Sequence, residues 1–394
     1  MGNELSRSPS NPRTDSSSRS RSRSWWSTKS GNQPTTPNGP GSGSAESCSA
    51  NMGFSNDADE ANLMWMDGRM YQNVRGSTYF LPRDDEELER INTQHFVLKT
   101  LFGGNYLSPV RRVLEGNGKK ILDIGCGPGT WLLVSKNKDF HDGYNPSRLF
   151  ESQHISSSHH PFPAPSFPSQ EMALEFPNVS CVGIDVADVF PNKKPPNTEF
   201  MIANVLDKLS FEDETFDFVN MRSLMLALRK NEWPDVLAEL YRVTKKGGLL
   251  QLTEMDIQFT TTDEFAKSFL ERVSFVLAGR GQDPVVATHL HNMIMDSGYD
   301  CIVRERKDVP IGWNGTLGDA MFEDTRSTYI AAAPLFSTVF AMTRDEYINH
   351  IEQVMRGLKS SEAQLKWYSA LGRKPEEEEE QEEEQEEEQE EPII

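Results

Sequence analysis

The chain has 394 residues, a hydrophobic content of 36% and a formal net charge of −20. The low hydrophobic content predicts long segments outside a folded core, and 13 glutamates lie in one run between residues 376 and 391. Without this run the net charge is −7, so we expect no broad basic face and no nucleic-acid partner. No apolar run approaches the roughly 20 residues of a membrane span, and no secretory signal follows Met1.

Composition divides the chain into one folded region and two tails. Residues 1–58 are rich in Ser, Arg, Asn, Pro and Gly, and residues 376–394 are mostly Glu and Gln. Neither segment has enough apolar surface to offset the entropy lost on ordering, so both are predicted to be disordered. We expect one domain over 70–375, with its core at 119–254 and a C-terminal cap and last strands at 255–375. The partners of the acidic tail are not readable from its sequence.

The N-terminus fits a lipidation pattern. Residues 1–6 match the N-myristoylation motif with Gly2 as the acceptor, and several basic residues follow before residue 30. One myristoyl chain binds membranes only marginally, and a basic segment supplies a second attraction. The pattern predicts weak membrane association through Gly2, and the alternative is a chance match in a disordered tail.

The cysteines favour a reducing compartment. Cys48, Cys126, Cys181 and Cys301 are far apart and match no metal-binding or redox spacing. We therefore expect free thiols, no metal site, and a cytoplasmic protein with a nuclear or peripheral-membrane pool.

Helical and strand patterns alternate along the folded region. A helix is expected at 84–102, where apolar residues recur at helical spacing behind an acidic first turn. Another helix begins after Pro234 and stops at Gly247-Gly248, and further helices are expected at 263–278 and 285–297. Strands are expected at 119–124, 179–185, 200–203, 216–220, 248–253, 301–303 and 366–371. This alternation predicts an α/β fold with a mostly parallel sheet and helices on both faces.

A glycine-rich turn follows the first of these strands. Residues 122–130 read Leu-Asp-Ile-Gly-Cys-Gly-Pro-Gly-Thr, in the order strand, turn and helix. Glycines allow the backbone to turn sharply and approach a ligand closely. Dinucleotide enzymes place a pyrophosphate at such a turn, but the Asp123 carboxylate would repel phosphate and suits a ligand with an ammonium group. The pattern favours S-adenosylmethionine over NAD.

Segment 134–170 interrupts the expected crossover helix. Joining Leu133 to Glu171 would give one amphipathic helix from Gly129 to Phe176. It would also shorten the separation of Gly129 and Asp185 from 56 residues to 19, near the roughly 20 that separate a glycine loop from its ribose-binding acid. The codons for 134–136 and 170 can carry splice-site sequences. Two hypotheses stay open, a retained intron and a disordered surface insertion.

The glycine turn resembles motif I of the class I S-adenosylmethionine-dependent methyltransferases. Residues 183–185 resemble the second motif, whose acid binds the ribose hydroxyls, and residues 203–205 resemble the adenine-binding segment, where Asp is more usual than Asn204. Residues 216–219 and 240–248 resemble the fourth strand and the turn before the fifth. The region from Tyr79 to His95 is similar to the lead-in of fungal methyltransferases of the secondary-metabolism-regulator type.

The resemblance covers about 70–375 and implies a Rossmann-like fold. Its sheet would have seven mostly parallel strands, with helices on both faces and the last strand antiparallel. The implied cofactor is S-adenosyl-L-methionine. The residues expected to bind it are Asp123, Gly125, Cys126, Gly127, Gly129, Asp185, Val186, Asn204, Val205 and Asn220.

The implied activity is methyl transfer to an acceptor that the sequence does not identify. The cofactor carries its own leaving group, so alignment of the reactants is the protein's main task. The catalytic candidates are Glu254, as a general base, and His95 and Tyr79, which are also candidates for a lid over the site. Residues after Thr262 are expected to cover the acceptor. A small-molecule acceptor is favoured, and the alternatives are a protein methyltransferase or regulatory subunit and a cofactor-binding scaffold without catalysis.

Overall fold

The computed structural model describes residues 63–72, 77–133 and 171–376. All of them lie in one compact unit, Ser55–Ile394. The expectations for Gly2, for segment 134–170 and for both tails, apart from Glu376, lie outside the described residues.

The domain is built on a seven-stranded sheet that confirms the predicted fold class. In spatial order the strands are β5 (Thr198–Ile202), β4 (Ser180–Asp185), β3 (Lys120–Ile124), β6 (Phe216–Arg222), β7 (Thr244–Thr260), β9 (Gln364–Arg373) and β8 (Asp300–Pro310). The strands from β5 to β7 in this order are mutually parallel, and β9 runs antiparallel to both of its neighbours. The strand order reverses at β3, which pairs with β4 on one side and β6 on the other. Such a reversal opens a crevice at the carboxyl ends of the strands.

Both faces of the sheet are covered. Ile121 and Phe218 pack in one hydrophobic cluster, whereas their chain neighbours Leu122 and Val219 pack in the other. Because successive side chains of a strand point to opposite faces, this division means that apolar side chains cover the sheet on both sides.

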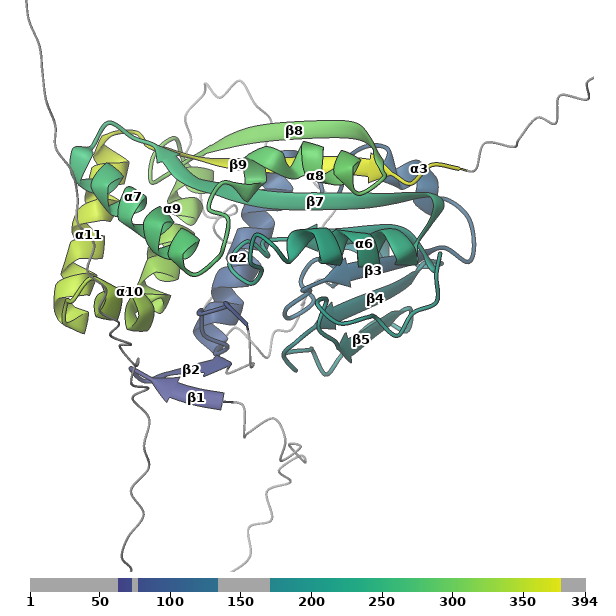
Figure 1. Cartoon of the computed structure of the whole chain (residues 1–394), viewed down its shortest axis with the longest axis horizontal. Coiled ribbons are helices and arrows are strands. Elements are labelled where there is room, and N and C mark those ends of the chain that lie inside the picture. The colour runs from purple at the N-terminus through teal and green to yellow at the C-terminus, as the bar shows by residue number, and fades with distance from the viewer. Residues whose placement is uncertain (1–62, 73–76, 134–170, 377–394) are drawn as a thin grey trace, which may run out of the picture. The chain divides into compact units, whose positions relative to one another are not determined.

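Helices and a small hairpin complete the domain, and Figure 1 shows several of the later helices gathered beyond one end of the sheet. These cap helices are α7 (Glu264–Gly279), α9 (Thr316–Ala331), α10 (Ala333–Val339) and α11 (Arg344–Ser360). The other elements are the hairpin β1 (Leu63–Met66) and β2 (Arg69–Gln72), then α2 (Asp85–Phe102), α3 (Val110–Leu114), α5 (Met172–Glu175), α6 (Trp233–Val243), the 3₁₀ helix η1 (Val286–His289) and α8 (Leu290–Asp296).

The first long helix has the ends that its sequence predicts. The Asp84 side chain accepts a hydrogen bond from the Glu87 amide at 3.1 Å, which satisfies one of the free amides of the first turn. Gly103, with φ of 75°, ends the helix in the left-handed region and donates to the carbonyls of the last turn. The prediction of a helix at 84–102 is confirmed.

Several predicted boundaries are wrong. Helix α6 ends at Val243 rather than Gly247, because the carbonyls of Arg242 and Val243 accept from the amides of residues 214 and 215 instead of continuing the helix. Strand β7 therefore begins at residue 244 and runs to 260. Strand β8 extends to residue 310, beyond the predicted end at 303. Because β8 is an edge strand, its alternate side chains are exposed and many of them are charged, so the sequence pattern did not indicate a strand there.

The expected crossover helix is interrupted, yet its two parts share one hydrogen-bond pattern. Leu133 donates to Gly129, and after segment 134–170 the amides of Met172 and Ala173 donate to the carbonyls of Trp131 and Leu132. These last two bonds would each span four residues if Leu133 were followed directly by Glu171, which is the spacing of an α-helix. Glu171 itself is extended, with ψ of 173°, in the chain that retains the segment, and the uninterrupted helix expected after removal of the segment stays a prediction.

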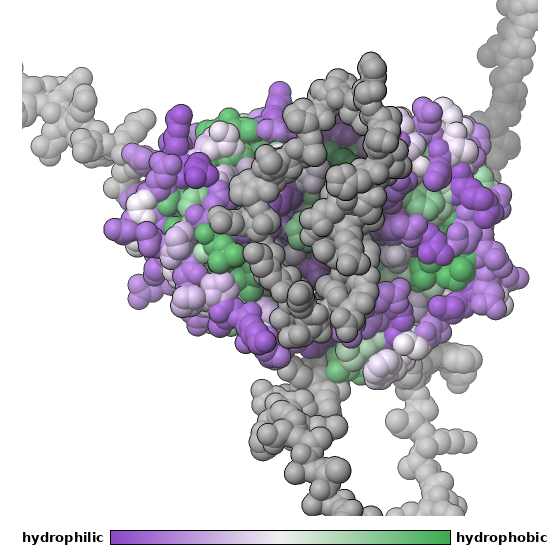
Figure 2. Space-filling model, turned by 180° about the vertical axis from the view of Figure 1, so that it is seen from behind, coloured by the Kyte–Doolittle hydropathy of each residue, from purple (hydrophilic) through white to green (hydrophobic). Residues whose placement is uncertain are grey.

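The surface seen in Figure 2 is largely hydrophilic, with separate smaller hydrophobic patches among the described residues. Within the described ranges, no helix combines the length and apolar character needed to cross a membrane.

Joining Leu133 directly to Glu171 is expected to preserve the fold and stabilise it. The junction already has helical hydrogen bonds, and removal of a 37-residue segment between fixed ends lowers the loop-closure cost by up to about 3 kcal/mol. Urea unfolding of the joined and full-length proteins measures the difference. A matched control carrying six Gly/Ser residues at the junction should fall between them. Loss of cooperative unfolding in the joined protein would contradict the prediction.

The retained-intron hypothesis stays a prediction with its own test. Sequenced transcripts should include forms that lack the codons of 134–170, and transcripts that all retain them would reject it.

Candidate functional site

A cavity of about 550 Å³ lies where the carboxyl ends of the parallel strands meet the cap helices. One part of its wall comes from the turns after β3, β4 and β5, and another from α2, α7, α9 and α10. The crevice where the strand order reverses at β3 is therefore continuous with the space under the cap helices.

The glycine turn after β3 has the backbone that its sequence predicts. Gly125 and Gly127 have φ of 62° and 53°, in the region where side chains other than glycine are strained. A Cβ added at Gly125 would lie 2.7 Å from the Leu224 side chain. The Cys126 amide donates to the Ile184 carbonyl, which holds the turn against the end of β4. The turn leaves open space where a ligand can approach the backbone.

Asp123 lies at the end of β3 on the wall of this cavity. Its carboxylate is buried and accepts a hydrogen bond from the Asn220 side chain at 2.8 Å. Burial raises the pKa of Asp123 to about 6, although Arg222 and the Asn220 hydrogen bond act in the opposite direction. A buried carboxylate of this kind would bind a cationic ligand group favourably, because a nearby positive charge stabilises its ionised form.

Asp185 ends β4 on the same wall. One carboxylate oxygen accepts from the Gly127 amide and the other from the Ala187 amide, both at 2.9 Å. Burial raises the pKa of Asp185, and these backbone hydrogen bonds oppose the increase. Each oxygen keeps an acceptor site, so the group can hold two hydroxyl donors. Asn204 follows β5, and its Oδ1 accepts from the Leu206 amide at 3.1 Å.

Eight of the ten residues predicted to bind the cofactor line the cavity. Gly129 does not, and a Cβ there would lie 2.5 Å from the Phe200 ring, so this glycine permits close packing of the turn against β5. Asn220 also lies outside the lining and acts on the site through its hydrogen bond to Asp123. It is set back because β6 continues two residues further than predicted, to Arg222.

The three residues named as chemical candidates differ in position. Both Glu254 oxygens accept backbone amides, from Leu224 at 2.7 Å and Met225 at 3.3 Å, and burial raises its pKa to about 8. Glu254 therefore holds the turn after β6, and it also lines the cavity. Tyr79 lines the cavity, and burial raises the pKa of its phenol. His95 does not line it.

His95 belongs to a buried polar group behind the site. Burial lowers its pKa to about 4, so the ring is neutral. Its Nδ1 accepts from Arg222 at 3.1 Å, and its Nε2 donates to Glu171 at 3.2 Å. Glu171 also accepts from Lys99 and Asn105, which ties α2 to the chain directly after segment 134–170.

The sequence reading missed the turn that follows β6. Residues 222–227 all line the cavity, and Ser223 has φ of 58°, an unusual backbone for this residue type. This turn could have been predicted as part of the site, because the carboxyl ends of neighbouring parallel strands meet at one edge of a sheet and β6 adjoins β3. The error came from ending the strand at Asn220.

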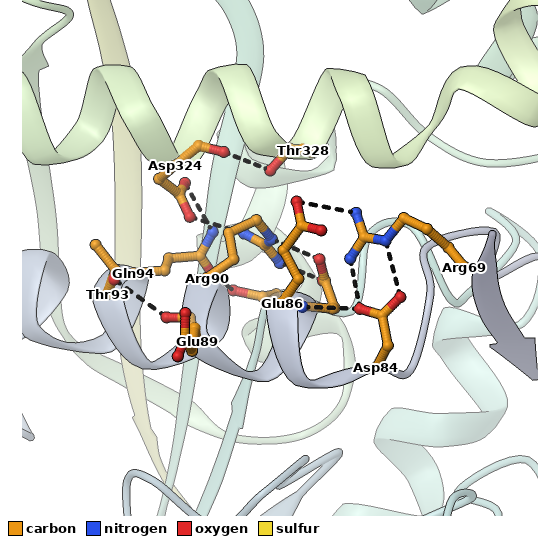
Figure 3. Close-up of polar contacts among 11 residues, drawn as sticks. Arg69, Asp84, Glu86, Glu89, Arg90, Thr93, Gln94, Asp324 and Thr328 are labelled. Atoms are coloured by element: carbon orange, nitrogen blue, oxygen red, sulfur yellow. Dashed lines mark hydrogen bonds and ion pairs between the residues drawn. The ribbon is translucent and has the colours of Figure 1, made fainter. Parts of the chain in front are cut away.

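The wall beside α2 carries a buried charge cluster, defined as Glu87, Arg90, Gln94 and Asp324. Arg90 makes paired hydrogen bonds to Glu87 at 2.7 and 2.9 Å and a third to Asp324 at 2.8 Å. Gln94 donates to the second Asp324 oxygen at 3.2 Å. Figure 3 shows Arg90 and Gln94 on α2 reaching Asp324 on α9, with Arg69 of β2 and the N-cap residue Asp84 near the start of α2. The cluster joins the α2 segment to the cap.

Thiol and metal chemistry have no support in the described part of the chain. Cys126 lines the cavity, and burial raises its pKa, which disfavours the reactive thiolate. Cys126, Cys181 and Cys301 are free. Among the described residues, no group of three or more His, Cys, Asp or Glu side chains could hold a metal ion.

Fold and site together define a Rossmann-like domain with a cavity between the carboxyl ends of its parallel strands and the cap helices. The methyltransferase domain family model matches residues 100–303, slightly more than half of the chain. The chain belongs to this methyltransferase domain family.

Curated fungal proteins are similar over much of the chain. Methyltransferase pytC of Aspergillus terreus is 24% identical over 297 residues, which cover 71% of this chain and 77% of that protein. Secondary metabolism regulator laeA of Coprinopsis cinerea is 24% identical over 62% of this chain and 56% of its own length. N-methyltransferase gliN of Aspergillus fumigatus is 26% identical over 47% of this chain and 53% of its own length. The alignments thus span little more than half of the last two relatives.

Solved structures are similar at lower identity. Phosphoethanolamine N-methyltransferase 2 of Haemonchus contortus, in complex with S-adenosyl-L-methionine, is 16% identical with a TM-score of 0.38, over 78% of this chain and 62% of that one. A putative sarcosine dimethylglycine methyltransferase of Galdieria sulphuraria is 14% identical with a TM-score of 0.38, over 76% of this chain and 93% of that one.

Replacement of Arg90 by alanine is expected to destabilise the protein by about 3–5 kcal/mol, because it leaves two buried carboxylates without their cation. Arg326 on α9 is a matched control, since it pairs with Glu352 on α11 but is partly exposed. Arg326→Ala should cost less than about 1 kcal/mol. Urea unfolding at neutral pH measures both changes. Equal losses in the free energy of unfolding for the two variants would contradict the prediction that the buried Arg90 ion pairs stabilise the fold more than an exposed pair does.

Proposed function

We propose that this protein binds S-adenosylmethionine in the sheet half of the cavity and transfers its methyl group to a small molecule in the cap half. The main support for this proposal is that a single cavity is lined by both the glycine turn and residues of the cap. These cap residues include Val273, Leu277, Asp324 and Phe336. Cofactor and acceptor would share a single space, as direct displacement requires.

The residues of the sheet half fit this cofactor. The Asp123 carboxylate would take its ammonium group, and the two Asp185 oxygens would accept from the ribose hydroxyls. The segment at Asn204 and Val205 would hold the adenine. Positive φ at Gly125 and Gly127 lets the backbone approach the amino-acid part of the ligand. When bound, the cofactor supplies an electrophilic methyl group on a sulfonium.

The protein's own contribution is alignment of the two reactants and exclusion of water. Orientation of this kind can lower a barrier by roughly 7–11 kcal/mol. The acceptor half is largely apolar, with Ile257, Phe259, Leu277 and Phe336 on its wall. An apolar wall supports a small organic acceptor, and a protein acceptor or a scaffold without catalysis would be outcomes of the experiments below.

Cofactor affinity should fall as the pH is lowered through about 6. The pKa of Asp123 in the free protein is raised to about 6, and a cation binds to its ionised form. Affinity is therefore constant above pH 7 and decreases up to tenfold for each pH unit below 6. Calorimetric titration with S-adenosylmethionine between pH 5 and 8 measures this dependence.

Asp123→Asn is the matched variant for this titration. This variant should bind S-adenosylmethionine more than tenfold more weakly at pH 7.5. Below pH 6 its affinity should depend less on pH than that of the unaltered protein, and any pH dependence that remains is assigned to Asp185. Wild-type affinity in the variant would remove Asp123 from the site. If the unaltered protein releases no heat at any pH, the proposed function itself is rejected.

Labelled cofactor identifies the kind of acceptor. After incubation with a fungal cell extract, the methyl label is expected in the small-molecule fraction and not in protein. Asp185→Ala, which loses the ribose contact, should reduce labelling by more than tenfold. Label confined to protein would favour the protein-methyltransferase alternative, and tight cofactor binding without any transfer would favour the scaffold.

A further inference from the structure

The cap half of the cavity carries more negative than positive charge. In the buried charge cluster, Glu87 and Asp324 contribute two carboxylates, and Arg90 contributes the single guanidinium. Glu87 and Asp324 are at most 5% exposed and Arg90 is 9% exposed, so water screens these charges weakly. Arg69 lies nearby but pairs with Asp84 and Glu86, and it adds no surplus positive charge.

The remaining arginines of the cavity wall are engaged elsewhere. Arg222 donates to His95 and interacts with Asp123, and Arg229 pairs with Glu232. Arg83 donates to Gln72 and to the Asp188 carbonyl. No other Lys or Arg is among the residues that line the cavity, so the second carboxylate of the cluster has no cation of its own in the described structure.

The phenol of Tyr329 lies on the same wall. Tyr329 of α9 lines the cavity and is 7% exposed, and burial alone raises the pKa of its phenol, which makes no hydrogen bond to a described residue. Its ring packs edge-on against Phe269, with centroids 5.1 Å apart. This hydroxyl is therefore available to a bound ligand.

Aromatic rings form much of the surrounding surface. Phe80 and Phe336 lie edge to face with centroids 5.8 Å apart, and Tyr79 and Phe259 are further parts of the lining. The charges of Glu87, Arg90 and Asp185 all act on the Tyr79 phenol. Tyr79 is thus within electrostatic reach of both the proposed ribose acid and the charge cluster. Faces of aromatic rings attract cations, most strongly where water is excluded.

We propose that the methyl acceptor is an amine on an apolar scaffold, bound in its ammonium form by Asp324 and Glu87 among these aromatic rings. This inference rests on the proposed function and deepens it. The surplus carboxylate gains the cation that it lacks, and the apolar walls take the remainder of the molecule. The Tyr329 hydroxyl is a further hydrogen-bonding group for the scaffold.

The same carboxylate has a second use in the reaction. An ammonium has no free electron pair, so the amine must lose one proton before it can react. Asp324 can receive that proton. The freed pair would then form the N–C bond while the S–C bond of the cofactor breaks, leaving neutral S-adenosylhomocysteine, the methylated amine as an ammonium, and the first proton on Asp324.

Matched probes test the charge requirement without turnover. The full chain is saturated with S-adenosylhomocysteine and titrated calorimetrically with phenethylamine and tryptamine, and with the corresponding alcohols 2-phenylethanol and tryptophol. At least one amine should bind more than tenfold more tightly than its alcohol. Equal binding of both members of each pair, or binding of none, overturns the proposal.

Asp324→Asn keeps the shape of the side chain and removes its charge. It should weaken amine binding by more than tenfold while the affinity for S-adenosylhomocysteine stays unchanged. Glu323→Gln is the control, since Glu323 is the preceding residue on α9 and its side chain is 65% exposed; it should change neither affinity. Unchanged amine binding in folded Asp324→Asn overturns the proposal.

A third variant covers failure of Asp324→Asn to fold. Tyr329→Phe removes only the unpaired hydroxyl, so the fold should be retained, and it should weaken the bound amine at least threefold without changing its preference over the alcohol. A preference for alcohols in this variant would overturn the inference. Failure of the wild-type protein to bind S-adenosylhomocysteine would instead reject the proposed function.

Discussion

The site depends on the register in which β3 pairs with its two parallel neighbours. Asp123 lies opposite Gly183 on β4 and Asn220 on β6. Gly183 leaves room for the Phe200 ring and the Cys126 sulfur, because a Cβ there would lie within 3 Å of both. Asn220 supplies the hydrogen bond that holds the Asp123 carboxylate. A shift of one residue would turn Asp123 to the other face of the sheet and remove the acid from the cavity.

Local patterns explain how much of this arrangement could be predicted. The glycine turn, the α2 helix with its Asp84 cap and the strand that ends at Asp185 are encoded within short windows, and their chemistry follows from residue type and spacing. The seven mostly parallel strands and the antiparallel last strand are expected from the family resemblance, which gives no strand order. Strand β8 could not be delimited, because an edge strand exposes charged side chains that look like a loop in the sequence.

The acceptor half could not be predicted because it is made by distant parts of the chain. Arg90 and Asp324 are 234 residues apart, and nothing near either residue indicates that they meet. The roles of His95 and Glu254 also depend on their surroundings. His95 is fixed between Glu171 and Arg222, and Glu254 by two backbone amides. Burial and hydrogen bonding place His95 behind the wall, whereas Glu254 lines the cavity and its role as a base stays a prediction.

The junction between Leu133 and Glu171 also bears on how the domain can be divided. The helical bonds from Met172 and Ala173 back to Trp131 and Leu132 bring two separate stretches of chain to one place. The contact is reinforced from α2, where His95 and Lys99 bind the Glu171 carboxylate. Covalent continuity therefore contributes little to the geometry here. Two polypeptides ending at 133 and beginning at 171 would carry complementary halves of one helical turn, which makes this position a natural site for fragment complementation.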